Sequence, residues 1–283
     1  MEQADRCPHM DMSIFMEKPD AMIIKVLTIA GSDSGNGAGI QADLRVFHYL
    51  GLYGLSALTA VTAQNTLGVQ AVFPSPRRQL AAQLRSITSD MRPVVTKTGM
   101  LPAVDIIDEV YENALTGALG QLVIDPVLAS TGGVRLVNDE CAQQLMKKLI
   151  PVCRLVTPNL DEAALLTGRR INNGKDASDA ARDLVANGAE AACVTGGHWQ
   201  GEPVDYLFDG LEITELSGKR VGSSERIHGT GCFFSAAAAG YLALGKDVPD
   251  ALAKAKSLIE IAIRDAVRPG EGMPVPWLKS LSR

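Results

Sequence analysis

The segment from His228 to Ser235 carries the residue types best suited to binding an anion. It reads His-Gly-Thr-Gly-Cys-Phe-Phe-Ser and opens an alanine-rich run over 235–244 that predicts a helix. Glycine lets the backbone approach a ligand closely, and the unpaired N–H groups at a helix start carry partial positive charge. We therefore predict an anion pocket formed by Gly229, Thr230 and Gly231. A glycine turn before an ordinary buried helix would have the same sequence.

A thiol stands beside this predicted pocket. Cys232 belongs to the first helical turn, and a helix N-terminus lowers the pKa of a thiol and favours the thiolate. The remaining cysteines are scattered, at positions 7, 141, 153 and 193, with no Cys-x-x-Cys spacing. An odd total of five without such spacing argues against a disulfide framework or a zinc site. A reducing, cytoplasmic setting is the default expectation.

Other polar residues follow predicted strands. Asp125 ends a strong apolar run, and its carboxylate is either solvated or holds a cation. Asn159 and Glu162 are three apart at a predicted helix start, which is capping-box spacing. They could instead hold Mg²⁺ or its waters, because hydrated Mg²⁺ needs few protein oxygens. Lys97 also ends an apolar strand, where a paired structural lysine is the commoner interpretation.

The loop over 31–39 is rich in glycine but fits neither standard nucleotide motif. Its glycines run Gly35-x-Gly37-x-Gly39, and no Gly-Lys-Ser/Thr follows. A dinucleotide site or a P-loop is therefore a weak interpretation. The loop is either a plain strand-to-helix turn or a lid or floor for a small ligand.

Strand and helix patterns alternate along most of the chain. The predicted strands are 23–30, 55–61, 69–73, 94–98, 121–127, 154–157 and 191–195, with a hairpin over 203–221 centred on Asp209-Gly210. The predicted helices are 40–50, 76–90, 103–116, 138–150, 159–167, 176–187, 230–244 and 248–267. This alternation predicts an α/β fold with a parallel sheet covered on both faces. Ligands of such sheets bind beyond the carboxyl ends of the strands, so we expect the polar loops to converge on one rim.

Composition narrows the class of protein further. The chain has 283 residues, 46% of them hydrophobic and only 5% aromatic, with a net charge of −5. The sequence gives no sign of a basic face that would bind nucleic acid, and it has no apolar stretch long enough to span a membrane. We expect residues 1–22 to be a flexible extension and 23–283 to form a single domain.

Taken together, the motifs resemble the hydroxymethylpyrimidine/phosphomethylpyrimidine kinases of thiamin biosynthesis, within the ribokinase-like superfamily. The matching stretches are 28–43, 62–66, 97–100, 125–127, 157–162, 196–198 and 228–232. The resemblance implies a three-layer fold, a homodimer, and an ATP- and Mg²⁺-dependent kinase that acts on a primary alcohol. It covers roughly residues 25–268, and its motifs are highly specific in combination.

The resemblance also implies roles for particular residues. Gly31, Asp43, Gln64 and Met100 would contact the pyrimidine. The nucleotide and metal positions are Asn159, Thr195 and Gly197 for ATP, and Asp125 and Glu162 for Mg²⁺. The helix start at 229–232 would be the anion hole for the transferring phosphoryl group. Cys232 stands where many sugar kinases of the superfamily carry an aspartate base.

The sequence departs from the family at two points. Thr195 replaces the lysine that commonly precedes Gly-Gly-His, and Ser130-Thr131 stands where some relatives place another lysine. Thr195 leaves open a catalytically inactive ligand-binding relative. A pyridoxal or pyridoxine kinase also remains open, because some enzymes with the same cysteine motif act on pyridoxal, as does a thiol hydrolase that uses Cys232.

Overall fold

The computed structural model describes residues 23–197, 201–221 and 226–279. The predicted extension over residues 1–22 and His198 lie outside this part. Nine strands form one sheet in the order β3-β2-β1-β4-β5-β6-β7-β8-β9. Their bounds are β1 Lys25–Asp33, β2 Tyr53–Asn65, β3 Gly68–Pro74, β4 Val95–Thr98, β5 Gln121–Ile124, β6 Leu155–Val156, β7 Ala192–Val194, β8 Val204–Phe208 and β9 Ile213–Ser217. The six strands from β2 to β7 in this order are mutually parallel, whereas β3, β8 and β9 pair antiparallel.

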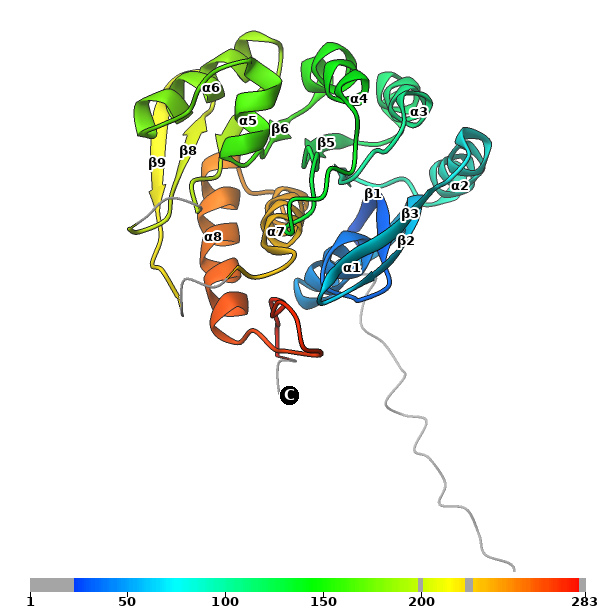
Figure 1. The fold of residues 1–283 in the computed structure, drawn as a ribbon. Helices are drawn as coiled ribbons and strands as arrows, with labels where there is room; N and C mark the ends of the chain where they lie inside the picture. The colour runs from blue at the N-terminus through cyan, green and yellow to red at the C-terminus, as the bar shows by residue number, and fades with distance from the viewer. Residues whose placement is uncertain (1–22, 198–200, 222–225, 280–283) are drawn as a thin grey trace, which may run out of the picture.

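Helices cover both faces of the sheet (Figure 1). Their bounds are α1 Gly39–Tyr49, α2 Arg77–Asp90, α3 Val104–Leu115, α4 Asp139–Gln144, α5 Leu160–Thr167, α6 Gly174–Ala186, α7 Thr230–Ala243 and α8 Val248–Arg264. Helices α1, α7 and α8 lie on one face, and α2 to α6 lie on the other. The structure confirms the predicted three-layer, mostly parallel α/β architecture.

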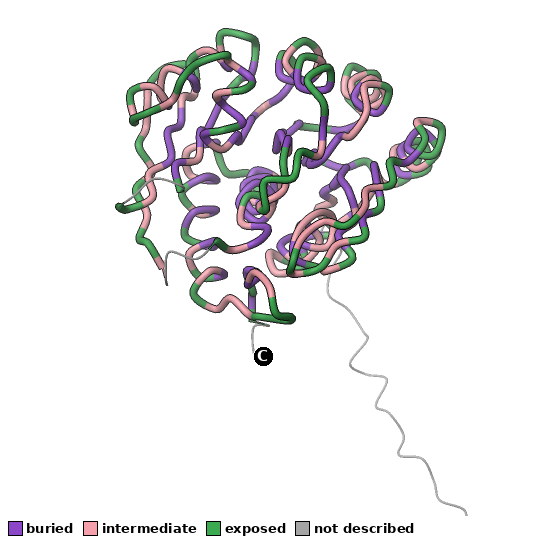
Figure 2. Tube along the Cα trace, viewed as in Figure 1, coloured by how far each residue is buried: buried purple, intermediate pink, exposed green. Residues whose placement is uncertain are grey.

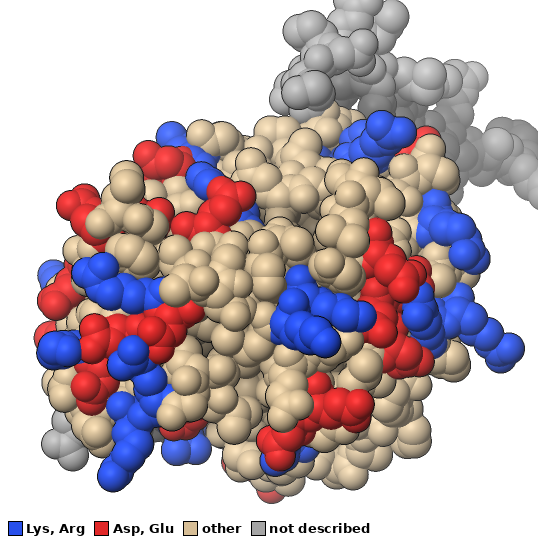
Figure 3. Space-filling view, turned by 90° about the horizontal axis from the view of Figure 1, so that it is seen from above, with Lys and Arg blue, Asp and Glu red and all other residues tan. Residues whose placement is uncertain are grey.

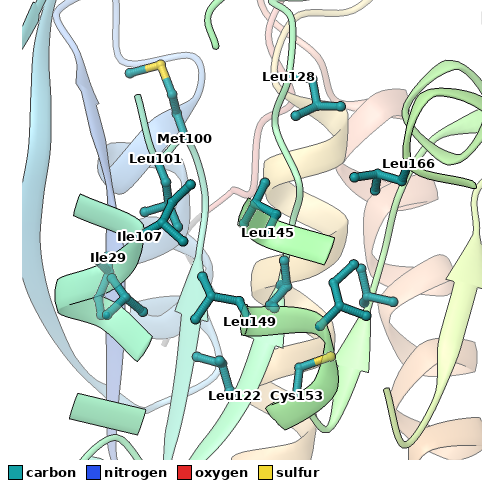
Figure 4. Packing of buried hydrophobic residues seen from close by; sticks show 14 of the residues in the cluster. Ile29, Met100, Leu101, Ile107, Leu122, Leu128, Leu145, Leu149, Cys153 and Leu166 are labelled. Atoms are coloured by element: carbon teal, nitrogen blue, oxygen red, sulfur yellow. The ribbon is translucent and has the colours of Figure 1, made fainter. Parts of the chain in front are cut away.

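The alternation of side chains along each strand builds two apolar layers. In β1, Val26 packs toward α1, α7 and α8, whereas Leu27 and Ile29 pack toward α2 to α6. Figure 4 shows this second layer, where Leu145 and Leu149 lie with Leu122 of β5. Figure 2 shows the central strands and α7 buried and the outer sides of the peripheral helices exposed.

Helix α7 is the central helix of its layer. Residues 233–240 are all buried, and α7 packs on both α1 and α8. Its alanines allow neighbouring elements to approach closely on every side. The sequence pattern of α7 is accordingly apolar all round instead of striped.

Several element boundaries differ from those predicted, and three of the differences have a clear local cause. β5 ends at Ile124 instead of residue 127, since Pro126 has no N–H to give the ladder. β2 continues to Asn65 because its polar end pairs with β3, with Gln64 opposite Val69. The helix predicted over 138–150 is α4 followed by a π-helical turn, Leu145–Leu149, and a 3₁₀ turn, Ile150–Val152. That irregular end contains Pro151, which cannot continue an α-helical hydrogen-bond ladder.

The C-terminal segment beyond α8 returns to the rim of the sheet. Val267 bridges Val275, and the N–H of Met273 donates to Thr66 O at 2.9 Å in the turn between β2 and β3. The guanidinium of Arg45 on α1 lies over the rings of both Phe233 and Trp277. This segment therefore joins α1, α7 and the β2–β3 turn.

The face seen from above carries charges of both signs. Lys and Arg side chains are interspersed there with Asp and Glu (Figure 3). None of the helices in the described part of the chain combines the length and apolar character that a membrane span requires.

Candidate active site

The parallel strands deliver their loops to one rim, as predicted. The N–H of Gly99 after β4 donates to Ile29 O of β1 at 2.9 Å, and the N–H of Thr195 after β7 donates to Pro158 O at the same distance. Side chains from α1, β4 and α7 then meet across these loops. The candidate site is built from residues that are far apart in the sequence.

The start of α7 lies directly against the glycine-rich loop. Gly229 is the N-cap and has φ +88°, a left-handed conformation that favours glycine. A Cβ at Gly229 would stand 2.0 Å from Gly37 O, so a side chain would push the two segments apart. Within the described ranges no side chain caps this helix. A Cβ built on Gly231 would meet no described heavy atom within 4 Å beyond its chain neighbours and the backbone of its own helix. The first-turn amides are therefore suited to binding an anion.

Asp33 organises the glycine-rich loop. Its carboxylate accepts the N–H groups of Gly35 at 2.7 Å, Gly37 at 3.0 Å and Ala38 at 2.8 Å. Burial alone would raise the pKa of Asp33, but hydrogen bonds from His228 and the loop amides outweigh it and hold the pKa below its usual value. The ionised carboxylate of Asp33 therefore holds the glycine-rich loop in one conformation.

A buried ion network lies beneath the anion pocket. Lys97 is fully buried, and its Nζ lies 3.0 Å from both carboxylate oxygens of Asp43 and 3.6 Å from Asp125. Thr28 donates to Asp43 at 2.6 Å, and Ser235 of α7 donates to Asp125 at 2.8 Å. Burial opposes the charge on Lys97, but the combined attractions of Asp43, Cys232 and Asp125 outweigh it and raise the lysine pKa. Lys97 is thus a paired lysine, as expected.

The thiol of Cys232 contradicts the prediction of a low pKa. Burial raises the pKa of Cys232 to about 12, and although Lys97 lowers it, the carboxylates of Asp125 and Asp43 oppose that effect. The helix start does not compensate, since a thiolate would join a cluster with two carboxylates and a single ammonium. A backbone contact with Gly39 places the half-buried thiol beside the glycine-rich loop.

Glu162 and Asn159 form the capping box that their spacing indicated. Asn159 Oδ1 accepts the N–H of Glu162, and Glu162 Oε2 accepts the N–H of Asn159, both at 2.9 Å. Burial, and next to it the charge of Asp125, raises the pKa of Glu162 to about 8. Asp125 and Glu162 are two buried carboxylates that repel each other, and a bound cation would relieve this repulsion. Their oxygens are ligands of the kind that Mg²⁺ prefers, so the pair fits Mg²⁺. Among the described residues no group of three or more His, Cys, Asp or Glu side chains forms a metal cluster.

The residues expected to contact the substrate are brought together in part. A Cβ on Gly31 would lie 2.6 Å from the Met100 methyl, so these two are neighbours. Gln64 contacts the glycine-rich loop, because its backbone carbonyl accepts a hydrogen bond from the hydroxyl of Ser34 at 2.7 Å. Asp43 is different, since it is fully buried and engaged by Lys97 and Thr28.

The expected nucleotide positions lie along the rim beside α5. Asn159 and Thr195 form a bridge between their strand ends, and Gly197 is exposed. The N–H of Gly196 donates to Asp205 at 3.0 Å, and Lys256 of α8 donates to the same carboxylate at 2.7 Å. This buried ion pair fixes the loop after β7.

Sequence reasoning missed several residues that shape the site. Asp33 and His228 were within quoted motifs, but their types did not show that they contact each other. Asp205 and Lys256 gave no local signal, because a carboxylate on a strand and an ammonium on a distant helix meet only in the folded chain. Ser235 could have been found from the sequence, because it is a single hydroxyl within an otherwise apolar stretch of the predicted helix.

The comparisons with known proteins agree with this geometry. The family model described as Phosphomethylpyrimidine kinase matches residues 33–276. A hydroxymethylpyrimidine/phosphomethylpyrimidine kinase of Bacillus subtilis is 40% identical over 252 residues, covering 88% of this chain and 93% of the relative.

Two solved structures are also similar. The ADP complex of Bacillus subtilis pyridoxal kinase has a TM-score of 0.84 at 38% identity, covering 90% of this chain and 97% of that one. The Staphylococcus aureus pyridoxal kinase with AMP-PCP and pyridoxal has a TM-score of 0.83 at 34% identity, covering 90% and 93%. Fold and site together define a small-molecule kinase of the ribokinase-like class. The chain belongs to the phosphomethylpyrimidine kinase family and is a phosphotransferase.

Proposed function

We propose that this protein uses ATP to phosphorylate 4-amino-5-hydroxymethyl-2-methylpyrimidine, and then its monophosphate, in thiamin biosynthesis. The observation that carries the proposal is the start of α7, whose uncapped amides adjoin the glycine-rich loop at Gly37. The family match over residues 33–276 supports the pyrimidine as the substrate ring. The nucleotide in similar solved structures supports ATP as the donor.

The substrate ring is proposed to lie on the floor formed by Gly31, Gln64 and Met100. A side-chain amide pairs with an aminopyrimidine edge as donor and acceptor, which makes Gln64 the recognition residue. Asp43 serves this site by holding Lys97 in place, because both of its oxygens are already engaged.

Phosphoryl transfer here needs positioning and charge stabilisation more than covalent chemistry. The hydroxymethyl oxygen attacks the γ-phosphorus, the bond to the β-phosphate oxygen breaks, and ADP leaves. The amides of Thr230, Gly231 and Cys232 stabilise the charge on the transferring group. Mg²⁺, when bound, neutralises phosphate charge, and Asp125 and Glu162 are the carboxylates that would hold it or its waters.

The substrate proton is proposed to pass to Cys232. Its resting thiol is protonated, so it must first release its own proton to solvent, which the positive charge of the neighbouring Lys97 favours. The thiolate then takes the proton of the substrate hydroxyl. If Cys232 is the acceptor, C232A lowers kcat by about 100- to 10,000-fold. An unchanged kcat would make Cys232 a packing residue beside the pocket.

Asn159, Thr195 and Gly197 are proposed to line the ATP side. Thr195 supplies no positive charge, and the nearby Lys256 is committed to Asp205 at 2.7 Å. The charge on the phosphates is therefore met by backbone amides and Mg²⁺ in this proposal.

Steady-state kinetics with ATP and each candidate alcohol test the proposal. We expect turnover of the hydroxymethylpyrimidine and of its monophosphate. Pyridoxal is the second candidate, because two similar solved structures are pyridoxal kinases. A chain active on pyridoxal alone, or one that binds the pyrimidine tightly without consuming ATP, would overturn the proposal.

We further propose a cytoplasmic homodimer. Val61 on β2 and Phe73 on the edge strand β3 are paired in register and are 48% and 62% exposed, which leaves an apolar strip at the sheet edge. Three buried free thiols, Cys141, Cys153 and Cys193, suit a reducing compartment. Light scattering on the wild type and on F73E tests the dimer, and a wild-type monomer at micromolar concentration contradicts it.

A further inference from the structure

His228 lies where four separate segments of the chain meet. Its side chain is buried, and its Nε2 is 3.0 Å from Asp33 Oδ2 and 2.7 Å from Gln64 Nε2. Its Nδ1 is 3.3 Å from Thr131 Oγ1 in the loop after β5, and its backbone N–H donates to Pro274 O at 2.9 Å. The imidazole thus contacts the glycine-rich loop, the end of β2 and the loop after β5, while the backbone of the same residue binds the C-terminal segment.

The hydrogen-bond partners of His228 determine that its Nε2 carries a hydrogen. Asp33 is ionised and can only accept hydrogen bonds, so a close Nε2 must carry a proton. An Nε2–H cannot also accept from an amide N–H. Since the oxygen and nitrogen of a carboxamide are assigned from their partners, this contact turns Gln64 Oε1 toward the imidazole, and the single Nε2–H is shared between Gln64 Oε1 and Asp33 Oδ2.

Thr62 favours the same orientation of Gln64. Its hydroxyl donates to Ser32 O at 2.9 Å, which uses its single proton. The carboxamide of Gln64 lies 3.4 Å from the same hydroxyl oxygen. Thr62 can therefore only accept, and it faces the amide nitrogen. Two independent neighbours specify one orientation.

We propose that His228 is a positioning residue that fixes the carboxamide of Gln64 and thereby sets the pattern of donor and acceptor offered to the substrate ring. This inference rests on the proposed function, in which Gln64 contacts the pyrimidine. An aminopyrimidine edge places a ring-nitrogen acceptor beside an amino donor, so only one orientation of the amide matches it. Without His228 only the longer contact with Thr62, at 3.4 Å, orients the amide, and part of its population rotates and meets the ring with like groups.

Binding measured by calorimetry without turnover tests the role of His228. We expect H228A to weaken binding of the hydroxymethylpyrimidine about tenfold, the scale set by freeing one ordered side chain. Binding of AMP-PCP should change less than about twofold, since Gln64 does not serve the nucleotide. H228Q, whose amide can place a donor near Nε2, should keep the wild-type affinity within about threefold, whereas H228N should not. H48A removes an exposed histidine of α1 and is the matched control.

A double-mutant cycle separates this role from simple support of the α7 turn. If His228 acts through Gln64, H228A has little further effect in a Q64A background. Losses that multiply, or equal weakening of pyrimidine and AMP-PCP, would overturn the inference. Thermal unfolding checks each fold, and if H228A does not fold, equal affinities for H228Q and H228N overturn it instead. A wild type that does not bind the pyrimidine refutes the proposed function itself, which is a distinguishable result.

Discussion

At the level of single residues, the surroundings of Cys232 decide its chemistry. A helix start favours a thiolate, yet Cys232 shares its site with two carboxylates and a single ammonium, and its pKa is about 12. The local sequence showed the helix start but not Asp43 and Asp125, which come from other elements. A thiol pKa therefore depends on tertiary neighbours that a motif does not contain.

Alkylation of Cys232 tests this protonation state. In a C7S background, we expect its reaction with iodoacetamide to accelerate about tenfold per pH unit from pH 7 to 10 without a plateau, because only the thiolate reacts. Peptide mass spectrometry follows the site, with the buried Cys141 and Cys193 as internal controls. A plateau near pH 7 would show that the helix start dominates after all.

Glu162 offers a second residue-level prediction, because its cap and its charge can be separated. Glutamine also serves in a capping box, so E162Q should keep α5 while removing the charge beside Asp125. The raised pKa of about 8 means that ionising Glu162 costs the folded state stability as pH rises from its unfolded value through 8. We expect the wild-type Tm to fall over this range more than that of E162Q, and Mg²⁺ at pH 8 to stabilise the wild type more.

Thermal melts with and without Mg²⁺ measure this effect. N173A removes the side-chain cap of α6 and is the control, since it should cost about 1 kcal/mol without changing the response to Mg²⁺. If the Tm of E162Q and of the wild type responds equally to pH and to Mg²⁺, Glu162 caps α5 but does not take part in binding Mg²⁺.

At the level of elements, periodicity predicted the order and type of the helices and strands because each one buries an apolar face or stripe. The parallel strands then determined that Asp125, Asn159 and Thr195 share one rim. Boundaries failed where pairing or proline decided them, as at the polar end of β2 and at Pro126 after β5. The contacts of Asp33 with His228 and of Asp205 with Lys256 could not be foreseen, because they depend on three-dimensional packing between elements.

Substitution of two glycines at the start of α7 tests whether this helix start forms the anion pocket. G229A should destabilise the fold by more than about 1 kcal/mol, because alanine is strained at φ +88° and its Cβ would collide with Gly37 O. G231A meets open space and improves helix propensity by about 1 kcal/mol, so its Tm should not fall. Its methyl group would nevertheless stand at the pocket. We expect slower turnover with a normal Tm for G231A, and wild-type kinetics for G231A would exclude the proposed anion hole.

At the scale of the whole molecule, the C-terminal segment connects parts of the site that the sheet alone does not join. It contacts the β2–β3 turn at Thr66, the backbone of His228 and the side chain of Arg45. Trp277 anchors this segment. The Arg45 guanidinium lies 5.2 Å from the centroid of its ring, and its backbone N–H donates to Ala262 O of α8. Substrate recognition at Gln64 should therefore depend on a residue more than 200 positions away in the sequence.

We predict that W277A loosens this connection without touching the nucleotide side. Loss of the cation–π contact and its packing should cost about 1 kcal/mol, which lowers Tm by about 2–4 °C in a chain of this size. The KM for the hydroxymethylpyrimidine should rise while the KM for ATP stays constant, because Thr66 and His228 adjoin Gln64 and not the loop after β7. L211A, at a side chain that is 89% exposed in the β8–β9 hairpin, is the control and should change neither value. A W277A variant whose two KM values rise together would mean that the segment supports the whole rim and not the substrate side.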